Sequence, residues 1–408
     1  MKFFSSVSQF KPTHKLQETE NVKPRGKEGR RSHEFRRLMI KMLGRGYVPL
    51  ALHAIGGVQL GLFCKKSILA KVEHVSIADV TCGIGNVFHN KGAIGVFVQI
   101  RAHNMHDRDK MLKVKDSVIG RRTLLPRKKK SLKMLFVNSH MAAHVKNVEA
   151  RNYDYWRIVK ELENLAPRHF IPSRQKLANT REGEHHEESE SLNSGGDRLI
   201  DSMDHVFFCG DLNYRIDLPR ELVEEKVMQM KNSANKEQQV KNALIKQKDS
   251  HCIEWNEITE VDKIIFELLR HDQLTRVMAQ GQAFPDLAEA KITFPPTFKF
   301  DKGTKNYDTS HKKRIPAWTD RILFKPFGVK VVEYQSVEDS VHSDHRPVYA
   351  TFRVNMSGTK EKNDLVQPKE LVRRQLDSAR TPKEVHVPSF NLSKRKRRKL
   401  KKINVDNV

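Results

Sequence analysis

Few cysteines and no long hydrophobic run set the first limits on this chain. No stretch approaches about 18 consecutive apolar residues, so no transmembrane helix is expected. The apolar run in MKFFSSVSQF at the start is too short for a signal peptide. The four cysteines lie far apart and have no CxxC spacing, which argues against a zinc site. We interpret Cys64 and Cys209, which end apolar strands, as reduced core residues of an intracellular protein.

An excess of basic residues gives the chain a strong positive charge. Lysine and arginine together number 75 against 49 aspartates and glutamates, so the formal net charge is +26. A chain with this charge is attracted to polyanions, among them nucleic acids, acidic lipid headgroups and phosphorylated small molecules. Charge alone does not choose among these partners.

The patterned part of the chain predicts strands separated by helices. The strands are expected at Tyr47–Leu52, Val58–Cys64, Val72–Val80, Ala93–Ile100, Leu132–Asn138, His205–Cys209, Arg321–Phe324, Val329–Tyr334 and Val348–Phe352. The helices are expected at Phe35–Leu43, Val145–Leu165, Glu221–Met230 and Val261–Leu269. This mixture predicts an α/β layered architecture, as one large domain or as two or three smaller ones.

The remaining segments are polar. Residues 1–32 show little periodicity, and the hydrophobic periodicity is lost again after Val354. We interpret two polar segments, at about 105–131 and 172–204, as insertions. The tail at 355–408 contains KRKRRKLKK at 394–402. Such a run fits a solvated tail, a nuclear import signal or a patch that binds anionic membranes.

The segment FFCGDLNYRI (Phe207–Ile216) carries the strongest chemical signal. A buried strand ends at Gly210, and Asp211 and Asn213 follow two residues apart, so an extended backbone points both side chains the same way. A carboxylate beside an amide can activate and position a water molecule. The alternative is an Asx-type turn that only closes the strand.

Four other clusters follow or precede apolar strands. In the first cluster, His140 ends a strand and is followed by Arg151 and Asn152. The second is a glycine-rich loop that carries Asn90 and Lys91 and can bind an anion, although it lacks the P-loop spacing. The third cluster is KKRIPAWTDR (Lys312–Arg321), which Lys299 precedes, and the fourth is Asp344-His345. Each is ambiguous alone, since a hydrogen-bonded core histidine or a structural Asp320–Arg321 ion pair explains it equally well. Together they supply the bases and cations that water attack on a phosphate ester requires.

These motifs resemble those of the inositol polyphosphate 5-phosphatases, within the endonuclease/exonuclease/phosphatase superfamily. GDLNYR, RIPAWTDRIL, NSHMAAH with the following RN, and SDHRPV carry the resemblance, which runs from about Tyr47 to Phe352. It implies a four-layered α/β sandwich of two packed, mostly antiparallel sheets with helices outside, and it makes 33–354 the catalytic domain.

The resemblance also implies roles for individual residues. Asp211 would be the base that orients the nucleophilic water, Asn213 would contact the phosphate, and His140 and His345 would stabilise the phosphoryl group. His345 would act in partnership with Asp344, and Asp320 would support the network. The substrate cleft would be lined by Asn90, Lys91, Arg151, Asn152, Tyr214, Arg215, Lys299, Lys312, Arg314 and Arg321.

The chain departs from the family pattern in two places. The family opens with a WNxxG strand, which is absent here. A later family strand ends in a glutamate that ligates Mg²⁺, and the candidate for this ligand is Glu18 in Leu16-Gln17-Glu18. The alternative is that Glu18 is only a charged tail residue. Phe298 stands where relatives often have tyrosine, which removes one hydroxyl donor beside Lys299.

The leading hypothesis is therefore a Mg²⁺-dependent 5-phosphatase of phosphoinositide lipids or soluble inositol polyphosphates. A non-catalytic phosphoinositide-binding scaffold is the second hypothesis, and a nuclease is the third, against which PAWTDR argues. No nucleic acid is expected as a partner, whereas an anionic membrane surface is. A cytoplasmic protein at the membrane periphery follows as the expected location, with nuclear import through 394–402 as an alternative. The oligomeric state does not follow from the sequence.

Overall fold

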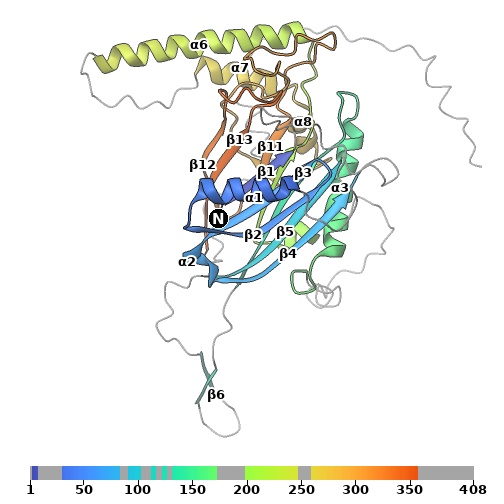
Figure 1. Cartoon of the computed structure of the whole chain (residues 1–408), viewed down its shortest axis with the longest axis vertical. Coiled ribbons are helices and arrows are strands. Elements are labelled where there is room, and N and C mark those ends of the chain that lie inside the picture. The colour runs from blue at the N-terminus through green and yellow to red at the C-terminus, as the bar shows by residue number, and fades with distance from the viewer. Residues whose placement is uncertain are drawn as a thin grey trace, which may run out of the picture.

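The structure is a computed structural model that describes residues 2–7, 30–82, 91–102, 112–115, 122–125, 131–171, 198–246 and 259–356. The fold is mixed α/β, with stacked sheets and helices outside (Figure 1). In this part of the chain, no helix is both long and apolar enough to cross a membrane.

A six-stranded sheet forms the centre of the molecule. Its strand order is β10-β11-β9-β8-β5-β4, and every neighbouring pair is antiparallel except β8 and β9, which are parallel. The strands are β4 (Val72–Thr81), β5 (Gly92–Arg101), β8 (Ser131–His140), β9 (His205–Asp211), β10 (Ala288–Glu289) and β11 (Asp320–Phe324).

Both faces of this sheet are buried, which explains the long apolar runs of its central strands. On β5, Phe97 packs into the cluster beneath α3 (Val148–Leu165), whereas Val96 and Val98 pack into a second cluster on the opposite face. On β9, Phe208 and Phe207 alternate in the same way. Successive residues of a strand point to opposite faces of the sheet. A strand that is buried on both faces therefore needs apolar residues at odd and even positions alike.

Two smaller sheets complete the second layer. One has the order β1-β3-β2 and the other pairs β12 with β13. Residues of β2, β3 and β13 join the apolar cluster on the face of the central sheet opposite α3. The strands are β1 (Lys2–Val7), β2 (Tyr47–Ile55), β3 (Val58–Lys65), β12 (Val329–Ser336) and β13 (Val348–Val354).

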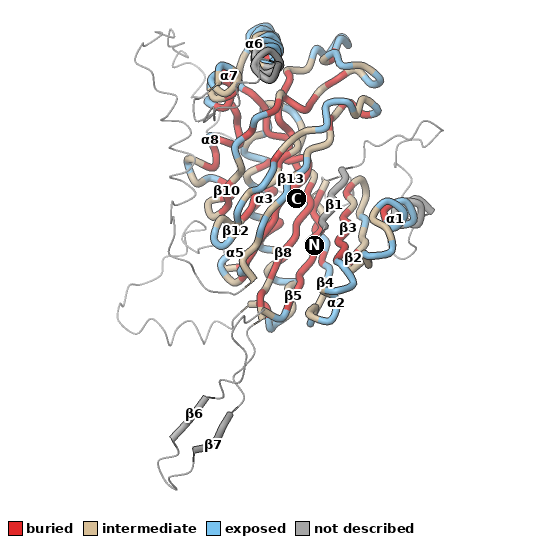
Figure 2. The backbone as a smooth tube through the Cα atoms, turned by 90° about the vertical axis from the view of Figure 1, so that its left-hand side faces the viewer, coloured by how far each residue is buried: buried red, intermediate tan, exposed pale blue. Residues whose placement is uncertain are grey.

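Helices lie outside the stacked sheets. Figure 2 shows α1 at one outer side, beside β2 and β3, whereas α3 packs on the other face of the central sheet, which agrees with the predicted order of helix, sheet, sheet and helix. The helices besides α3 are α1 (Arg30–Leu43), α2 (Lys66–Leu69), α5 (Arg198–Ser202), α6 (Arg220–Lys246), α7 (Glu260–Leu269) and α8 (Gln273–Gln280).

The structure differs from the sequence-based prediction at several elements. Residues 2–7, expected to lie in a polar segment without periodicity, form β1 and pair with β3. The first insertion contains a short hairpin of β6 (Leu112–Lys115) and β7 (Arg122–Leu125). Helix α6 extends well beyond the predicted Met230, and α8 was not predicted. The tail at 357–408 and most of the second insertion lie outside the described residues.

Candidate active site

One row of backbone positions across four strands brings the main site residues together. Gly92 of β5 pairs with His140 of β8, His140 with Asp211 of β9, and Asp211 with Asp320 of β11. Because β8 and β9 are parallel, both end at this edge, and the antiparallel β5 and β11 begin there. The register therefore places four residues from distant parts of the chain in a line.

The turn after β9 depends on Gly210. Its φ is +130°, and a Cβ atom there would lie 2.0 Å from the carbonyl oxygen of Ser139, so only glycine fits. The backbone N–H of Asn213 donates to Asp211 Oδ1 at 3.1 Å, and Asn213 has a φ of 59°. An Asx-type turn is therefore present, and it fixes the Asp211 carboxylate instead of competing with a role for it.

Asp211 is buried among charged groups. Burial raises the pKa of its carboxyl to about 6, and the negative charge of Asp320 adds to this effect. Its Oδ2 lies 3.4 Å from His140 Nε2, and Lys91 Nζ hydrogen-bonds the same ring nitrogen. Burial lowers the pKa of Lys91 to about 8. The carboxylate therefore ionises close to neutral pH beside a lysine that also titrates near neutrality.

His345 forms an ion pair with Asp320, which corrects the predicted pairing with Asp344. His345 Nδ1 lies 2.6 Å from Asp320 Oδ2. Burial acts to lower the pKa of His345, but the charge and hydrogen bond of Asp320 outweigh it and raise the pKa to about 9. Asp344 lies 3.4 Å from Lys299 Nζ, and its charge contributes a smaller effect on His345. Adjacency in sequence predicted the wrong carboxylate, because cross-strand geometry decides the contact.

Phe298 and Arg215 form the wall next to this pair. The Phe298 ring lies 4.5 Å from the His345 ring and 4.4 Å from the guanidinium carbon of Arg215. Arg215 donates to Asn213 Oδ1 at 2.5 Å, so the arginine and the turn hold each other. Burial lowers the pKa of Arg215, and the nearby positive charge of Arg314 acts in the same direction. Phe298 thus lies between two cations, an arrangement that the π face of the ring stabilises.

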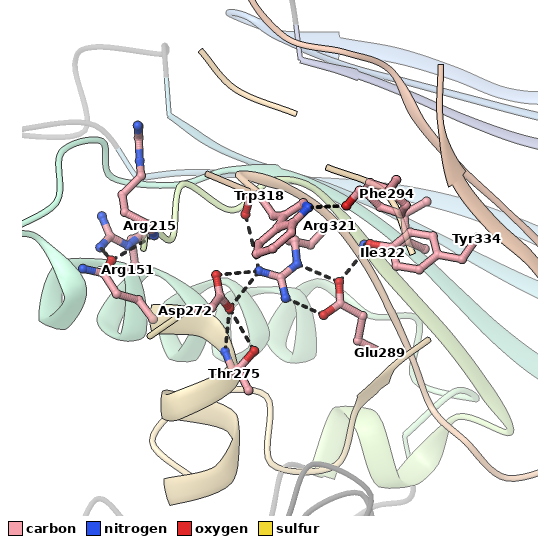
Figure 3. Close-up of polar contacts among 11 residues, drawn as sticks. Arg151, Arg215, Asp272, Thr275, Glu289, Phe294, Trp318, Arg321, Ile322 and Tyr334 are labelled. Carbon is pink, nitrogen blue, oxygen red and sulfur yellow. Dashed lines mark hydrogen bonds and ion pairs between the residues drawn. The ribbon is translucent and has the colours of Figure 1, made fainter. Parts of the chain in front are cut away.

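Arg151, Arg321 and Tyr214 lie behind the site, so the prediction that they contact substrate is wrong. Arg321 is 1% exposed and bridges Asp272 and Glu289 at 3.0 and 2.5 Å, as Figure 3 shows. Arg151 is fully buried and donates to backbone carbonyls and to the Gln273 side chain. The Tyr214 hydroxyl is turned inward and donates to Asn152 Oδ1 at 2.7 Å. These groups hold the elements of the site in place.

The other predicted residues fall into two groups. Asn152 and Arg314 are partly exposed, and Lys312 is exposed on the loop that precedes Ala317. This loop returns to the site, since Ala317 and Phe298 exchange backbone hydrogen bonds. Asn90 and Glu18 lie outside the described residues, so their predicted roles stay predictions.

Comparison with known proteins identifies the family. A model of the endonuclease/exonuclease/phosphatase family 2 matches residues 122–351. The chain belongs to this family. It resembles a phosphatidylinositol 4,5-bisphosphate 5-phosphatase of Saccharomyces cerevisiae, 31% identical over 311 residues, or 76% of this chain and 23% of that protein. An inositol-1,4,5-trisphosphate 5-phosphatase of Schizosaccharomyces pombe is 31% identical over 314 residues, covering 77% of this chain and 20% of that protein.

A solved structure is also similar to this member of the family. It is the inositol polyphosphate 5-phosphatase domain of a synaptojanin in complex with inositol (1,4)-bisphosphate and calcium, at 27% identity and a TM-score of 0.49, covering 85% of this chain and 72% of that one. The predicted resemblance to inositol polyphosphate 5-phosphatases is confirmed. The chain spans about a quarter or less of the length of the curated relatives named above.

The metal that the family resemblance implies does not find a complete ligand set in the described part of the chain. Within those residues, no group of three or more histidine, cysteine, aspartate or glutamate side chains could hold a metal ion. The Asp320 carboxylate is engaged by His345, and the candidate ligand Glu18 is not among the described residues.

Sequence reasoning missed the residues that support the site from α8. Gln273 Oε1 accepts from Arg151 and from the backbone N–H of Arg215, while its Nε2 donates to Asp217 and to the Val145 carbonyl. The only local signal was Asp272, an N-cap residue whose side chain accepts from the backbone N–H of Thr275. Nothing in the local sequence links α8 to Arg151, which lies 122 positions away.

Proposed function

We propose that this family member hydrolyses the 5-phosphate of phosphorylated inositol rings, in lipids such as phosphatidylinositol 4,5-bisphosphate or in soluble inositol polyphosphates. The observation that carries the proposal is the buried Asp211 carboxylate, held between the Lys91–His140 contact and the Asp320–His345 ion pair. The names of the two fungal relatives, which are 5-phosphatases of an inositol lipid and of inositol trisphosphate, support the same substrate class.

Each residue has a proposed part in the reaction. Above a pH of about 6, the Asp211 carboxylate is ionised and can accept a proton from the attacking water. The water oxygen bonds to phosphorus as the bond from phosphorus to the inositol oxygen breaks, and the leaving oxygen takes up a proton from solvent to become a hydroxyl group. His345, charged up to a pH of about 9, and His140 stabilise negative charge on the phosphoryl oxygens. Asn213 positions the phosphate, and Asp320 keeps His345 charged and oriented.

The substrate ring is proposed to lie against the basic and polar side chains around Phe298. Lys91, Asn152, Arg215, Lys299, Lys312 and Arg314 are proposed to line this region, with Asn90 added from outside the described residues. Because Lys299 is within 3.4 Å of Asp344, a bound phosphate competes with that carboxylate for the ammonium group. Phe298 cannot donate a hydrogen bond to a neighbouring phosphate, so selectivity at that position rests on the charges of Lys299 and Arg215.

Mg²⁺ is the proposed cofactor, and association with anionic membranes in the cytoplasm is the proposed setting. The metal proposal rests on the family resemblance, with Glu18 as the proposed ligand. Bound divalent metal would supply positive charge next to the scissile phosphate. Titrating Mg²⁺ into metal-free protein, with EDTA as the reversal, tests this requirement.

Phosphate release from a panel of inositides tests the activity. Wild-type full chain should release phosphate from substrates that carry a 5-phosphate and leave matched isomers without it intact, and Asp211→Ala should be inactive. Equal release by wild type and Asp211→Ala would exclude Asp211 as the base. Headgroup binding without any turnover at ample Mg²⁺ would favour the scaffold hypothesis, and cleavage of plasmid DNA alone would favour a nuclease.

A further inference from the structure

Helix α1 and the adjoining α2 form a basic surface with exposed apolar side chains, far along the chain from the site residues. No aspartate or glutamate occurs between Glu34 and Glu73, whereas seven lysines and arginines do. This acid-free stretch folds into the described part of α1, then β2, β3 and α2. One continuous region of the molecule is therefore basic without compensating acid.

The cations of this region are free to meet an external partner. The side chains exposed to solvent are Arg37, Lys41, Arg45, Lys65 and Lys66. The two ends of the region meet, because the Lys66 backbone N–H donates to the Gly46 carbonyl at 2.9 Å and Lys65 pairs with Tyr47. None of these five cations has an ion-pair partner among the residues that the structure describes.

The acidic residues that follow in β4 do not neutralise this surface. Glu73 is held by Arg101, Gln99 and Ser131, and Asp79 by His53. Arg101 and Gln99 lie on β5, Ser131 on β8 and His53 on β2, so neither carboxylate pairs with one of the five cations. The basic surface keeps its charge, which attracts an anionic surface within about a Debye length of 8–10 Å.

Apolar side chains project from the same surface. Leu38 is 54% exposed and Met42 is 72% exposed, although both are large and hydrophobic, and Leu69 on α2 is 43% exposed. Leu38 and Met42 are four residues apart and so share one face of α1, next to the face that carries Arg37 and Lys41. The neighbouring Met39 is buried, which anchors the helix on the body of the protein.

A helix with this combination has the chemistry of an interfacial membrane helix. Cations attract anionic headgroups, and exposed apolar side chains enter the boundary between headgroups and acyl chains. Figures 1 and 2 place α1 on the outermost side of the stacked sheets, where a flat surface can reach it. We propose that α1 and α2 dock the protein on an anionic lipid bilayer, as a binding surface separate from the active site and from the basic tail.

Vesicle binding by the full chain tests this proposal. The probe is sedimentation with phosphatidylcholine vesicles that contain about 30% phosphatidylserine, with pure phosphatidylcholine as the reference. Arg37→Gln/Lys41→Gln should lower the partition coefficient by about 25-fold, from roughly fivefold for each cation at the membrane surface. Leu38→Gln/Met42→Gln should also weaken binding by at least about fivefold while the net charge stays the same.

Matched controls separate this surface from general charge and apolarity. Lys330→Gln/Arg353→Gln removes two exposed cations from β12 and β13, and Val332→Gln removes an apolar side chain that is 57% exposed. Both variants should bind as wild type does. All variants lie on the surface, and unchanged circular dichroism and unchanged hydrolysis of a soluble substrate show that they fold.

The outcomes either support or overturn the proposal. It is supported if both α1 variants lose vesicle binding and both controls keep it. Wild-type binding by the Leu38→Gln/Met42→Gln variant, or equal losses in the controls, overturns it and leaves the tail or another partner as the explanation. The readout is binding, so a protein that binds vesicles but hydrolyses no inositide would contradict the proposed function and leave this inference intact.

Discussion

Replacing Asp320 by asparagine tests the proposed site through the charge of His345. The pKa of His345 is about 9, although its side chain is only 12% exposed and burial acts to lower that pKa. The opposing cause is the Asp320 carboxylate at 2.6 Å. Without its charge, burial is opposed only by the smaller effects of Asp211 and Asp344, so the pKa should fall to about the ordinary value of 6.5 or below. A fall of about 2.5 pH units corresponds to about 3.4 kcal/mol of interaction.

Both limbs of the pH profile should move in the same direction. In the wild type, kcat/KM should rise as Asp211 ionises near pH 6 and fall as His345 loses its proton near pH 9. In Asp320→Asn the alkaline limb should move to pH 6.5 or lower. The acidic limb should also move down, because the charge that helps to raise the pKa of Asp211 is gone. At a pH of about 7.5, fewer than about one tenth of the molecules would carry a protonated His345, so activity should fall at least about tenfold.

Initial rates of phosphate release from a water-soluble inositol polyphosphate, between pH 4.5 and 10, measure this profile. Asp344→Asn is the matched control, because Asp344 is next to His345 in sequence but has the smaller effect on its pKa. Its alkaline limb should remain near pH 9. The reasoning is refuted if Asp320→Asn retains an alkaline limb near pH 9, or if Asp344→Asn shifts it equally.

Three further substitutions have definite expected outcomes. Asp211→Asn should lower kcat by about 10²- to 10⁴-fold with little loss in stability to urea, since it removes a buried charge; wild-type turnover would exclude a general base here. Gly210→Ala should lower the free energy of unfolding by about 3 kcal/mol or more, whereas Gly303→Ala, which also has a positive φ but open space around it, should lose only about 1 kcal/mol by the same denaturation assay. Arg321→Met should cost about 3–5 kcal/mol in urea unfolding because it leaves two carboxylates unpaired, and a loss below about 1 kcal/mol would contradict the buried bridge.

The strands were predictable because their signal is local. Central strands such as β5 and β8 are covered on both faces, which requires continuous apolar runs, and those runs are visible in the sequence. The site residues just after them could also be found, since polar side chains directly after a buried strand are conspicuous. β1 gave no such signal, because two serines interrupt its six residues.

The contacts within the site were less predictable because they depend on register and on distant partners. The sequence places Asp344 beside His345, but the ion pair forms with Asp320, 25 positions away. Arg321 resembles a cleft cation until its buried carboxylate partners are seen, one of them 49 positions away. Burial and pairing of a charge are properties of the assembled fold, and local sequence patterns do not record them.

The geometry of the site depends most on the one parallel strand pair. If β9 ran antiparallel to β8, Asp211 would lie at the opposite edge of the sheet, about 20 Å from His140 over its seven residues. A parallel pair requires a crossover, and here α3 lies in that crossover and packs Ile158 and Leu162 onto the central sheet. The approach is close, since a Cβ atom on Gly95 would lie 2.8 Å from a Leu162 methyl carbon. The packing of the apolar face of α3 therefore brings His140 and Asp211 to the same edge of the sheet. The surrounding loops affect only what these two residues can bind.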